Sequence, residues 1–399
     1  MTSRLDELAA RTPATRDRYV DFLRAISILV VVVGHWLIGV VYWEGGVIGS
    51  TSAIGRTPWL WIATWFLQVM PIFFFVGGFS NLVTYRAHRR RGDSTWAFVR
   101  SRLTRLLRPS LVFVGVWAVI QIALHLLDVG APTTPFLRVV RPPGATIPFG
   151  PLWFLAVYAG VLMLSPVMIR LHERFGLGVI VVMVVGAVAA DAIGFTTSFE
   201  ESRWANVAFV WLLPHQLGFF YADGRITRLS RRAVWGMALG GLAALFLLTN
   251  PIFGDAGREW FPGVGHYPKS LLGTDVERIT NTYPPTICLV AMAFWSISVA
   301  LLLRDRLTRW LHRAGPWKAT IFVNSVIMTL FLWHMTAYLL AVLALWPLGL
   351  GQQGDTTASW WLERPLWVGV PAAFLTGFVA IFARIERPVR AAAAAERPR

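Results

Sequence analysis

The sequence predicts an all-α polytopic membrane protein with about ten transmembrane helices and both termini in the cytoplasm. Three observations support this fold class. Of the 399 residues, 56% are apolar and only 15% are charged, whereas about a quarter of the residues in an average soluble domain are charged. Apolar runs close to the length of a bilayer span recur along the whole chain. The basic residues are concentrated in every second connection between these runs, as the positive-inside rule requires of cytoplasmic loops.

The apolar runs define the membrane domain. A helix that rises 1.5 Å per residue needs about 20 apolar residues to cross the hydrocarbon core. The ten runs are Ala25–Trp43, Thr57–Tyr85, Pro109–Leu127, Pro151–Ile169, Phe175–Thr197, Trp204–Ala222, Ala233–Leu248, Tyr283–Leu303, Ala319–Leu348 and Pro365–Ala383. The ninth run is long enough to include a flanking loop or a strongly tilted helix. In the second run, we expect Pro71 to kink the helix.

The distribution of charge predicts the orientation. With ten spans, both termini lie on one side of the membrane, and the segments on that side carry 29 of the 37 lysines and arginines. This side is therefore expected to be the cytoplasmic face of the plasma (inner) membrane. The formal net charge of +16 then reflects membrane topology, and we expect no nucleic-acid partner. The single cysteine, Cys288, excludes a fold held by disulfides.

The same topology predicts the domain organisation. Residues 1–24 form a cytoplasmic N-terminal segment, and residues 25–386 form the ten-helix membrane domain. Residues 387–399 form a cytoplasmic tail, which we expect to be disordered because it is rich in alanine and charge at a chain terminus. The Gly- and Pro-rich segment Asn250–Thr282 is the largest loop expected on the external side.

Polar residues inside the spans are the natural place to search for chemistry, because ionisable groups in a bilayer usually face a cavity or a partner. These residues are His35, Gln68, His125, Asp191, His215, Gln216, Asn324 and His334. His35 follows Arg24 by eleven residues, which corresponds to about 16 Å of helix rise. Arg24 is thus expected at the inner surface and His35 near the midplane. A neutral imidazole there could accept a proton from a hydroxyl; the alternative is a histidine that only hydrogen-bonds a neighbouring helix.

A stripe of arginines precedes the third span. Arg102, Arg105 and Arg108 recur every third residue, so they lie along one side of a helix. Three guanidinium groups on one stripe suit phosphate groups, which they pair in a bidentate way. The alternative is a topology anchor or a contact with anionic lipid headgroups. The chain contains no HExxH, CxxC or GxxxxGK[ST] motif, so we expect no metal site and no nucleotide-hydrolysing domain.

Five segments, in this order, resemble the acyltransferase-3 family of integral-membrane acyltransferases. They are YVDFLRAISILVVVVGHW, PIFFFVGGF, RSRLTRLLRP, PLWFLAVYAGVLMLSP and LFLWHMTAY. The first is similar to the family's opening motif, in which ten residues separate an arginine and a histidine, here Arg24 and His35. The third is similar to its Arg-x-x-Arg motif, here Arg102 and Arg105. The second is similar to its Phe-Phe-x-x-Ser-Gly-Phe segment, but Gly77 stands in place of the serine.

The last two segments extend the resemblance to the second half of the membrane domain. The fourth places Trp153 in the family's Leu-Trp-Phe-Leu segment, and the fifth places His334 in its Tyr-Leu-x-His segment, with Phe331 in place of the tyrosine. The resemblance implies a ten-helix core that transfers an acyl group, acetyl or another short chain, from cytoplasmic acyl-CoA. The donor is expected to be acetyl-CoA. The implied acceptor is a hydroxyl of a sugar, glycolipid, polysaccharide or glycosylated small molecule.

Topology and resemblance together predict one mechanism. Arg24, Arg102 and Arg105 would hold the phosphates of acyl-CoA at the inner face, and the pantetheine arm would reach toward His35. His35 would act as general base on the acceptor hydroxyl; the alternative is that His35 itself is acylated as a nucleophile. The candidate donors to the resulting oxyanion are Trp153, Asn324 and His334. The competing function is a secondary transporter that uses the same intramembrane polar residues as a substrate pathway.

Overall fold

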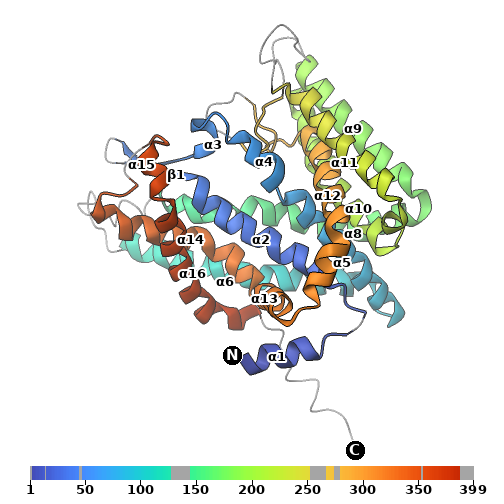
Figure 1. Cartoon of the computed structure of the whole chain (residues 1–399), viewed down its shortest axis with the longest axis horizontal. Coiled ribbons are helices and arrows are strands. Elements are labelled where there is room, and N and C mark those ends of the chain that lie inside the picture. Colours follow the sequence, from blue (N-terminus) through green and yellow to red (C-terminus); the bar gives the residue numbers. More distant parts are fainter. Residues whose placement is uncertain are drawn as a thin grey trace, which may run out of the picture.

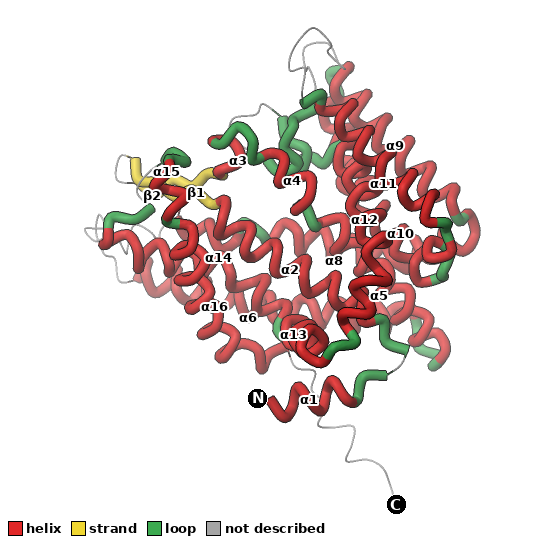
Figure 2. Tube along the Cα trace, viewed as in Figure 1, coloured by secondary structure: helices red, strands yellow, loops and turns green. Residues whose placement is uncertain are grey.

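The computed structural model describes the chain except for residues 1, 14, 45–46, 127–143, 252–266, 274–278, 352–353 and 387–399. The tail predicted to be disordered, 387–399, therefore lies outside the described residues, and so does much of the predicted external loop. Figure 1 traces the chain from the N-terminus to the end of the last long helix. Helices form nearly all of the described structure, and a single short hairpin supplies the strands (Figure 2).

Ten long helices of the described residues make up the bundle. They are α2 (Arg18–Ile38), α5 (Met70–Arg90), α6 (Thr95–Leu126), α8 (Leu152–Phe175), α9 (Leu177–Thr196), α10 (Asn206–Ala222), α11 (Arg231–Thr249), α12 (Ile287–Leu311), α14 (Ile327–Leu345) and α16 (Arg364–Glu386). The shorter helices among the described residues are α1 (Thr2–Ala10), α3 (Ala53–Arg56), α4 (Trp61–Leu67), α13 (Ala314–Ser325) and α15 (Ala358–Leu362). Strands β1 (Gly39–Glu44) and β2 (Val47–Ser52) pair in an antiparallel hairpin, with Gly39 opposite Ser52. The 3₁₀ turns are Gly144–Phe149, Glu200–Ala205, Ile226–Arg228 and Trp346–Leu348.

The prediction of an all-α polytopic membrane protein is confirmed. Nine helical segments within the described residues are long and apolar enough to cross a bilayer. The remaining predicted span, Trp204–Ala222, forms the 17-residue helix α10 after a 3₁₀ turn. It is short for a span, since 17 residues rise about 25 Å. Because 13 of its 17 residues are buried, α10 is a central helix of the bundle.

Two predicted spans end or begin differently from their apolar runs. The first run was expected to stay helical to Trp43, but α2 ends at Ile38 and the chain continues as β1. The residues Gly39–Glu44 read GVVYWE, and valine and aromatic side chains favour extended backbone over helix. In the second run, Pro71 does not kink a helix. It lies in the first turn of α5, where its missing N–H costs no hydrogen bond.

The ninth run is divided, as its length suggested. Helix α13 ends at Ser325, and α14 begins at Ile327 after a break at Val326. The first free N–H groups of α14 receive a carboxylate from another helix, because Glu386 at the end of α16 accepts hydrogen bonds from the backbone of Met328 and Thr329. An anionic side chain at this position also complements the helix dipole. Helices α1 and α13 lie together at the end of the bundle that carries the N-terminus (Figure 1).

Helices α5 and α10 approach each other with their backbones in contact. A Cβ atom built at Gly78 would lie 1.9 Å from the carbonyl oxygen of His215, and one at Gly218 would lie 2.1 Å from the carbonyl oxygen of Phe75. Only glycine fits at these two positions. Close contact through small residues is common between membrane helices. The glycine pair thereby holds α10 in the middle of the bundle, with α5 against it.

Replacing Gly78 by alanine should destabilise the bundle. The new methyl group has no space against the α10 backbone, and overpacking of this kind costs on the order of 1–3 kcal/mol or more. We expect a lower melting temperature in detergent, measured by fluorescence-detected size exclusion after heating. Gly115→Ala is the matched control, since nothing lies within 4 Å of a Cβ atom there. Equal melting of both variants and the wild type would contradict this crossing.

The orientation can be tested by cysteine labelling in a Cys288→Ala background. The native thiol is fully buried, so its removal should leave the surface unchanged. Gly273 is exposed and lies on the side expected to be external. Arg232 lies at the exposed start of α11, on the side expected to be cytoplasmic, and a cysteine is placed at each position in turn. A membrane-impermeant maleimide should label position 273 in intact cells and position 232 only after permeabilisation. Labelling of position 232 in intact cells would reverse the expected orientation.

Candidate active site

Two histidines from different helices meet near one end of α2. The Nδ1 atom of His35, one turn before the end of α2, lies 2.8 Å from the Nε2 atom of His334 in α14. The His334 side chain is fully buried, and its Nδ1 atom lies 2.6 Å from the carbonyl oxygen of Phe331. Trp36 donates a hydrogen bond of 3.0 Å from its indole nitrogen to the backbone carbonyl of His334. These contacts join α2 and α14 at the histidine pair.

The hydrogen-bond partners determine where the protons lie in the neutral pair. A carbonyl oxygen can only accept, so Nδ1 of His334 carries its hydrogen and Nε2 is left as an acceptor. Nδ1 of His35 must then donate to it, which leaves the lone pair of His35 on Nε2. His334 thus fixes the tautomer and the ring orientation of His35, as the orienting residue of a catalytic triad does for its histidine. His35 is thereby prepared to accept a proton at Nε2.

The end of α2 beyond His35 is also held in place. The hydroxyl of Tyr338 donates to the carbonyl of Gly39 over 3.0 Å, and a guanidinium nitrogen of Arg364 donates to the same oxygen over 3.3 Å. The Arg364 guanidinium lies over the rings of Trp360 and Trp367, at 3.6 and 5.3 Å from their centroids. These contacts terminate α2 and limit movement of His35.

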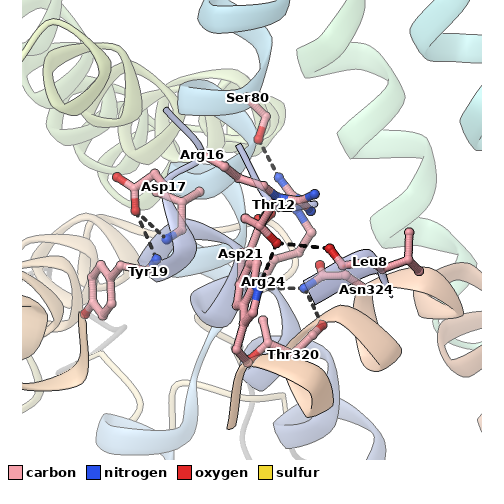
Figure 3. A network of polar contacts seen from close by, with 12 residues as sticks. Leu8, Thr12, Arg16, Asp17, Tyr19, Asp21, Arg24, Ser80, Thr320 and Asn324 are labelled. Atoms are coloured by element: carbon pink, nitrogen blue, oxygen red, sulfur yellow. Dashed lines mark hydrogen bonds and ion pairs between the residues drawn. The ribbon is translucent and has the colours of Figure 1, made fainter. Parts of the chain in front are cut away.

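Arg24 lies about 16 Å below His35 on the same helix, in a polar network (Figure 3). Its guanidinium donates to Oδ1 of Asp21 over 3.3 Å and to the hydroxyl of Ser80 in α5 over 2.5 Å. The other carboxylate oxygen of Asp21 accepts a hydrogen bond of 2.6 Å from Arg16. In Figure 3, Ser80 lies above the group formed by Arg16, Asp21 and Arg24 and is joined to it by a dashed line. Asp21 therefore shares its single charge between two arginines.

Arg102 of α6 is held by a buried polar chain. It donates from Nε to the amide oxygen of Asn81 over 3.2 Å, and the amide nitrogen of Asn81 lies 3.0 Å from Nε2 of His215. Asn81 and His215 are fully buried, and His215 lies on α10 at the crossing with α5. This chain connects the central helix of the bundle to an arginine of the predicted stripe.

The structure brings together the three arginines predicted to bind phosphate. Arg102 and Arg105 lie close enough to Arg24 for their like charges to repel one another. Arg105 is exposed, and the carboxylate of Glu386 lies close enough to attract its positive charge. Arginines that converge with so few opposing carboxylates leave a positive region, which suits a multiply charged anion. Arg108, the third residue of the stripe, is exposed.

Gly77, which stands in place of a family serine, adjoins this region. A Cβ atom at Gly77 would lie 3.0 Å from the ring of Tyr158 in α8, so the tyrosine ring fills the space that a serine side chain would need. Tyr158 is also close enough to Arg24 and Arg105 to interact with their charges. Sequence reasoning missed Ser80, Asn81 and Tyr158; the polar pair Ser80–Asn81, directly after the glycines in an otherwise apolar span, was the available signal.

Within the described residues, two of the predicted oxyanion donors, Asn324 and Trp153, form no hydrogen bond with the histidine pair. Asn324 donates to the carbonyls of Asp21 and Thr320 over 2.8 and 2.9 Å, so its amide joins α13 to the Arg24 end of α2. Trp153 is 40% exposed and makes ring contacts with Phe154 and Trp211. The third, His334, does contact His35, but its Nε2 atom serves as the acceptor of the His35 hydrogen. These contacts therefore assign neither Asn324 nor His334 as a donor to an oxyanion beside Nε2 of His35.

Two other polar residues of the predicted spans, Asp191 and Gln68, hold elements of the fold together. Asp191, fully buried in α9, accepts hydrogen bonds from Asn206, Tyr267 and the backbone N–H of Ile287 at 2.7, 3.0 and 2.9 Å. The Asp191 carboxylate thereby joins the loop residue Tyr267 to helices α9, α10 and α12. Gln68 donates to the carbonyl of Leu271 over 3.1 Å, which extends the same attachment to the chain between α4 and α5. Within the described residues, no cluster of side chains could hold a metal ion.

The comparison with protein families decides the class. The acyltransferase-3 family model, described as an acyltransferase domain, matches residues 17–384, nearly the whole chain. The chain belongs to the acyltransferase-3 family. No curated protein and no solved structure matches it. This acyltransferase-3 protein is therefore a multi-pass membrane acyltransferase, and the transporter alternative is not favoured. The matched range contains the histidine pair and all three converging arginines.

Loss of either histidine should lower acyl transfer by the same large factor. A positioned general base contributes about 10²–10⁴-fold, so His35→Ala and His334→Ala should each lose transfer on that scale. The double variant should be little worse than either single variant, because residues that act as a unit are not additive. The measurement is the initial rate of acyl transfer by purified protein in nanodiscs.

The histidine at the exposed end of α6 supplies the matched control. His125 is exposed, and His125→Ala should retain the wild-type rate. His334→Gln can still accept a hydrogen bond from His35 and should recover part of the activity lost in His334→Ala. Wild-type rates in His334→Ala would show that the pair serves packing alone.

Proposed function

We propose that this acyltransferase moves an acetyl or other short acyl group from cytoplasmic acyl-CoA to a hydroxyl of a carbohydrate or lipid-like acceptor. The observation that carries the proposal is the oriented His35–His334 pair, with Arg24 of the arginine cluster about 16 Å from it along α2. The pair supplies a base for a hydroxyl, and the cluster supplies cations for a phosphate-bearing donor. The acceptor is expected to be a sugar, a glycolipid, a polysaccharide or a glycosylated small molecule.

The spacing of the two sites suits the shape of acyl-CoA. Arg24, Arg102 and Arg105 would pair the diphosphate in a bidentate way. The pantetheine arm has an extent of roughly 15 Å if each of its bonds spans the length of an extended backbone bond. The rise from Arg24 to His35 is about 16 Å. A donor whose diphosphate contacts the arginines would therefore present its thioester near the histidine pair.

The proposed reaction is direct transfer with His35 as general base and then general acid. The acceptor hydroxyl gives its proton to Nε2 of His35 while its oxygen attacks the thioester carbonyl carbon. The tetrahedral intermediate then collapses, the carbon–sulfur bond breaks, and the thiolate of CoA takes the proton from Nε2. During the step His35 is a cation, and the bond from its Nδ1 hydrogen to His334 stabilises that charge. Direct transfer is preferred to an acyl-histidine because Nε2 needs only to move one proton.

The donor chemistry sets the expected location. Acyl-CoA is made in the cytoplasm, and the arginine cluster lies at the end of the bundle where α1 and the chain's basic segments gather. We therefore place this end at the cytoplasmic face of the plasma membrane, in keeping with the positive-inside pattern. The acceptor would reach His35 from within the bundle or from the opposite face.

The test of the function is thioester turnover. Purified protein in nanodiscs is given radiolabelled acetyl-CoA and a glycolipid extract, with His35→Ala as the inactive reference. We expect release of free CoA and transfer of label to an extracted lipid or glycoside, identified by mass spectrometry. Transport of a solute without any cleavage of the thioester would reject the proposal.

The arginine cluster yields a separate prediction for the donor. Arg102→Ala and Arg105→Ala should raise the KM for acetyl-CoA, since each lost contact with a charged group should cost on the order of 1.5–3 kcal/mol. Lysine at either position should restore only part of the affinity, because it cannot pair in a bidentate way. Arg100→Ala, exposed on the same helix, is the control. Unchanged donor titrations in folded variants would assign the stripe to membrane anchoring.

A further inference from the structure

A basic hollow lies at the ends of three helices, outside the site described so far. It has a volume of about 490 Å³ and is lined by Arg86, Arg89, Arg90, Arg170 and Glu173, together with two uncharged residues. The first three arginines come from the last turns of α5, and the other two charged residues come from the end of α8. Four guanidinium groups thus face one carboxylate across a space of small-molecule size.

The positive charge of the hollow is largely uncompensated. Arg86 is fixed by Asp223 at 2.6 Å and lies 3.9 Å from Glu173. Arg89, Arg90 and Arg170 are exposed, and none of them forms an ion pair within the residues that the structure describes. One wall is therefore rigid and neutralised, whereas the other arginines remain free to bind an anion. Guanidinium groups in this arrangement favour phosphate, which they pair in a bidentate way.

The wall around Arg86 is built into the bundle. The second carboxylate oxygen of Asp223 lies 2.8 Å from Nε2 of the buried His172, whose Nδ1 atom lies 2.9 Å from the amide nitrogen of Gln216 in α10. Buried hydrogen bonds thus hold Asp223, and through it Arg86, in place at this wall of the hollow. Tyr85 and Thr95 complete the lining and add an aromatic ring and a hydroxyl.

The hollow continues the region of the converging arginines. Helix α5 carries Asn81, which holds Arg102, and it reaches Arg86 about 8 Å further toward its end. Helix α6 carries Arg102, and its first residue, Thr95, lines the hollow. Helix α8 carries Tyr158 near Arg24 and ends at the hollow. Helices α5, α6 and α8 therefore border both the hollow and the region of the converging arginines.

We propose that this hollow binds the 3′-phosphoadenosine end of the acyl-CoA donor. The inference rests on the proposed function, in which Arg24, Arg102 and Arg105 hold the diphosphate and the pantetheine arm extends to His35. The opposite end of the same molecule must then lie toward the ends of α5, α6 and α8. Its 3′-phosphate supplies the anion that Arg89, Arg90 and Arg170 lack. An anionic lipid headgroup carries the same phosphate chemistry, and the test separates the two sources.

The test compares two donors that differ by this phosphate alone, acetyl-CoA and acetyl-3′-dephospho-CoA. In nanodiscs of phosphatidylcholine, the wild type should have a KM roughly tenfold lower for acetyl-CoA, the factor that corresponds to one charge-assisted contact. The double variant Arg89→Gln/Arg170→Gln should raise the KM for acetyl-CoA to that of the dephospho donor at unchanged kcat. Arg231→Gln/Arg232→Gln, at exposed positions on α11, should keep the wild-type preference.

Three outcomes would overturn the inference. One is an equal KM for the two donors in the wild type, and another is an unchanged preference in the double variant. The third is an effect of the double variant that appears only in nanodiscs containing phosphatidylglycerol and is equal for both donors, which would assign the hollow to lipid headgroups.

Binding of adenosine 3′,5′-bisphosphate, measured by calorimetry, separates this inference from the proposed function. We expect the wild type to bind it and the double variant to lose binding. Binding without thioester turnover would reject the proposed reaction and retain the hollow as a nucleotide site. Thioester turnover without binding of the bisphosphate, and without a preference between the two donors, would retain the proposed reaction and reject the hollow as a nucleotide site.

Discussion

A polar side chain inside a bilayer cannot turn to water, so it must find its hydrogen-bond partner on another helix. This constraint organises the bundle. His35 of α2 is paired with His334 of α14 at 2.8 Å, and Asn81 of α5 is paired with His215 of α10 at 3.0 Å. Each contact both satisfies a buried group and fixes the relative position of two helices. The residues assigned to chemistry are therefore also among the residues that hold the helices together.

Close packing makes these polar contacts possible. At the crossing of Gly78 and Gly218, the backbones of α5 and α10 touch, which brings His215 within reach of Asn81. The buried helix α10 then acts as the frame on which α5 and, through Arg102, α6 are positioned. A side chain larger than hydrogen at either glycine would push α5 away from α10, and the hydrogen bond between Asn81 and His215 would lengthen.

The bundle separates two kinds of chemistry along its axis. Guanidinium groups gather at the end where α2 begins, and the imidazole pair lies about 16 Å above Arg24 near the other end of the same helix. A rigid helix carries both, so their spacing is set by backbone geometry and not by flexible loops. His334 and the backbone carbonyl of Phe331 determine which nitrogen of His35 is free, a property that no single helix possesses alone.

The sequence alone determined the helical membrane architecture, because the length and spacing of apolar runs follow directly from bilayer thickness. It also determined the rise that separates Arg24 from His35 along one helix, and the stripe formed by Arg102 and Arg105, because these are local relations along a helix. Only the tertiary structure decided that His334 is the partner of His35, that Asn324 instead joins α13 to α2, and that Pro71 starts a helix. Contacts between helices distant in the chain depend on how side chains pack in three dimensions, and hydropathy and spacing carry no record of that packing.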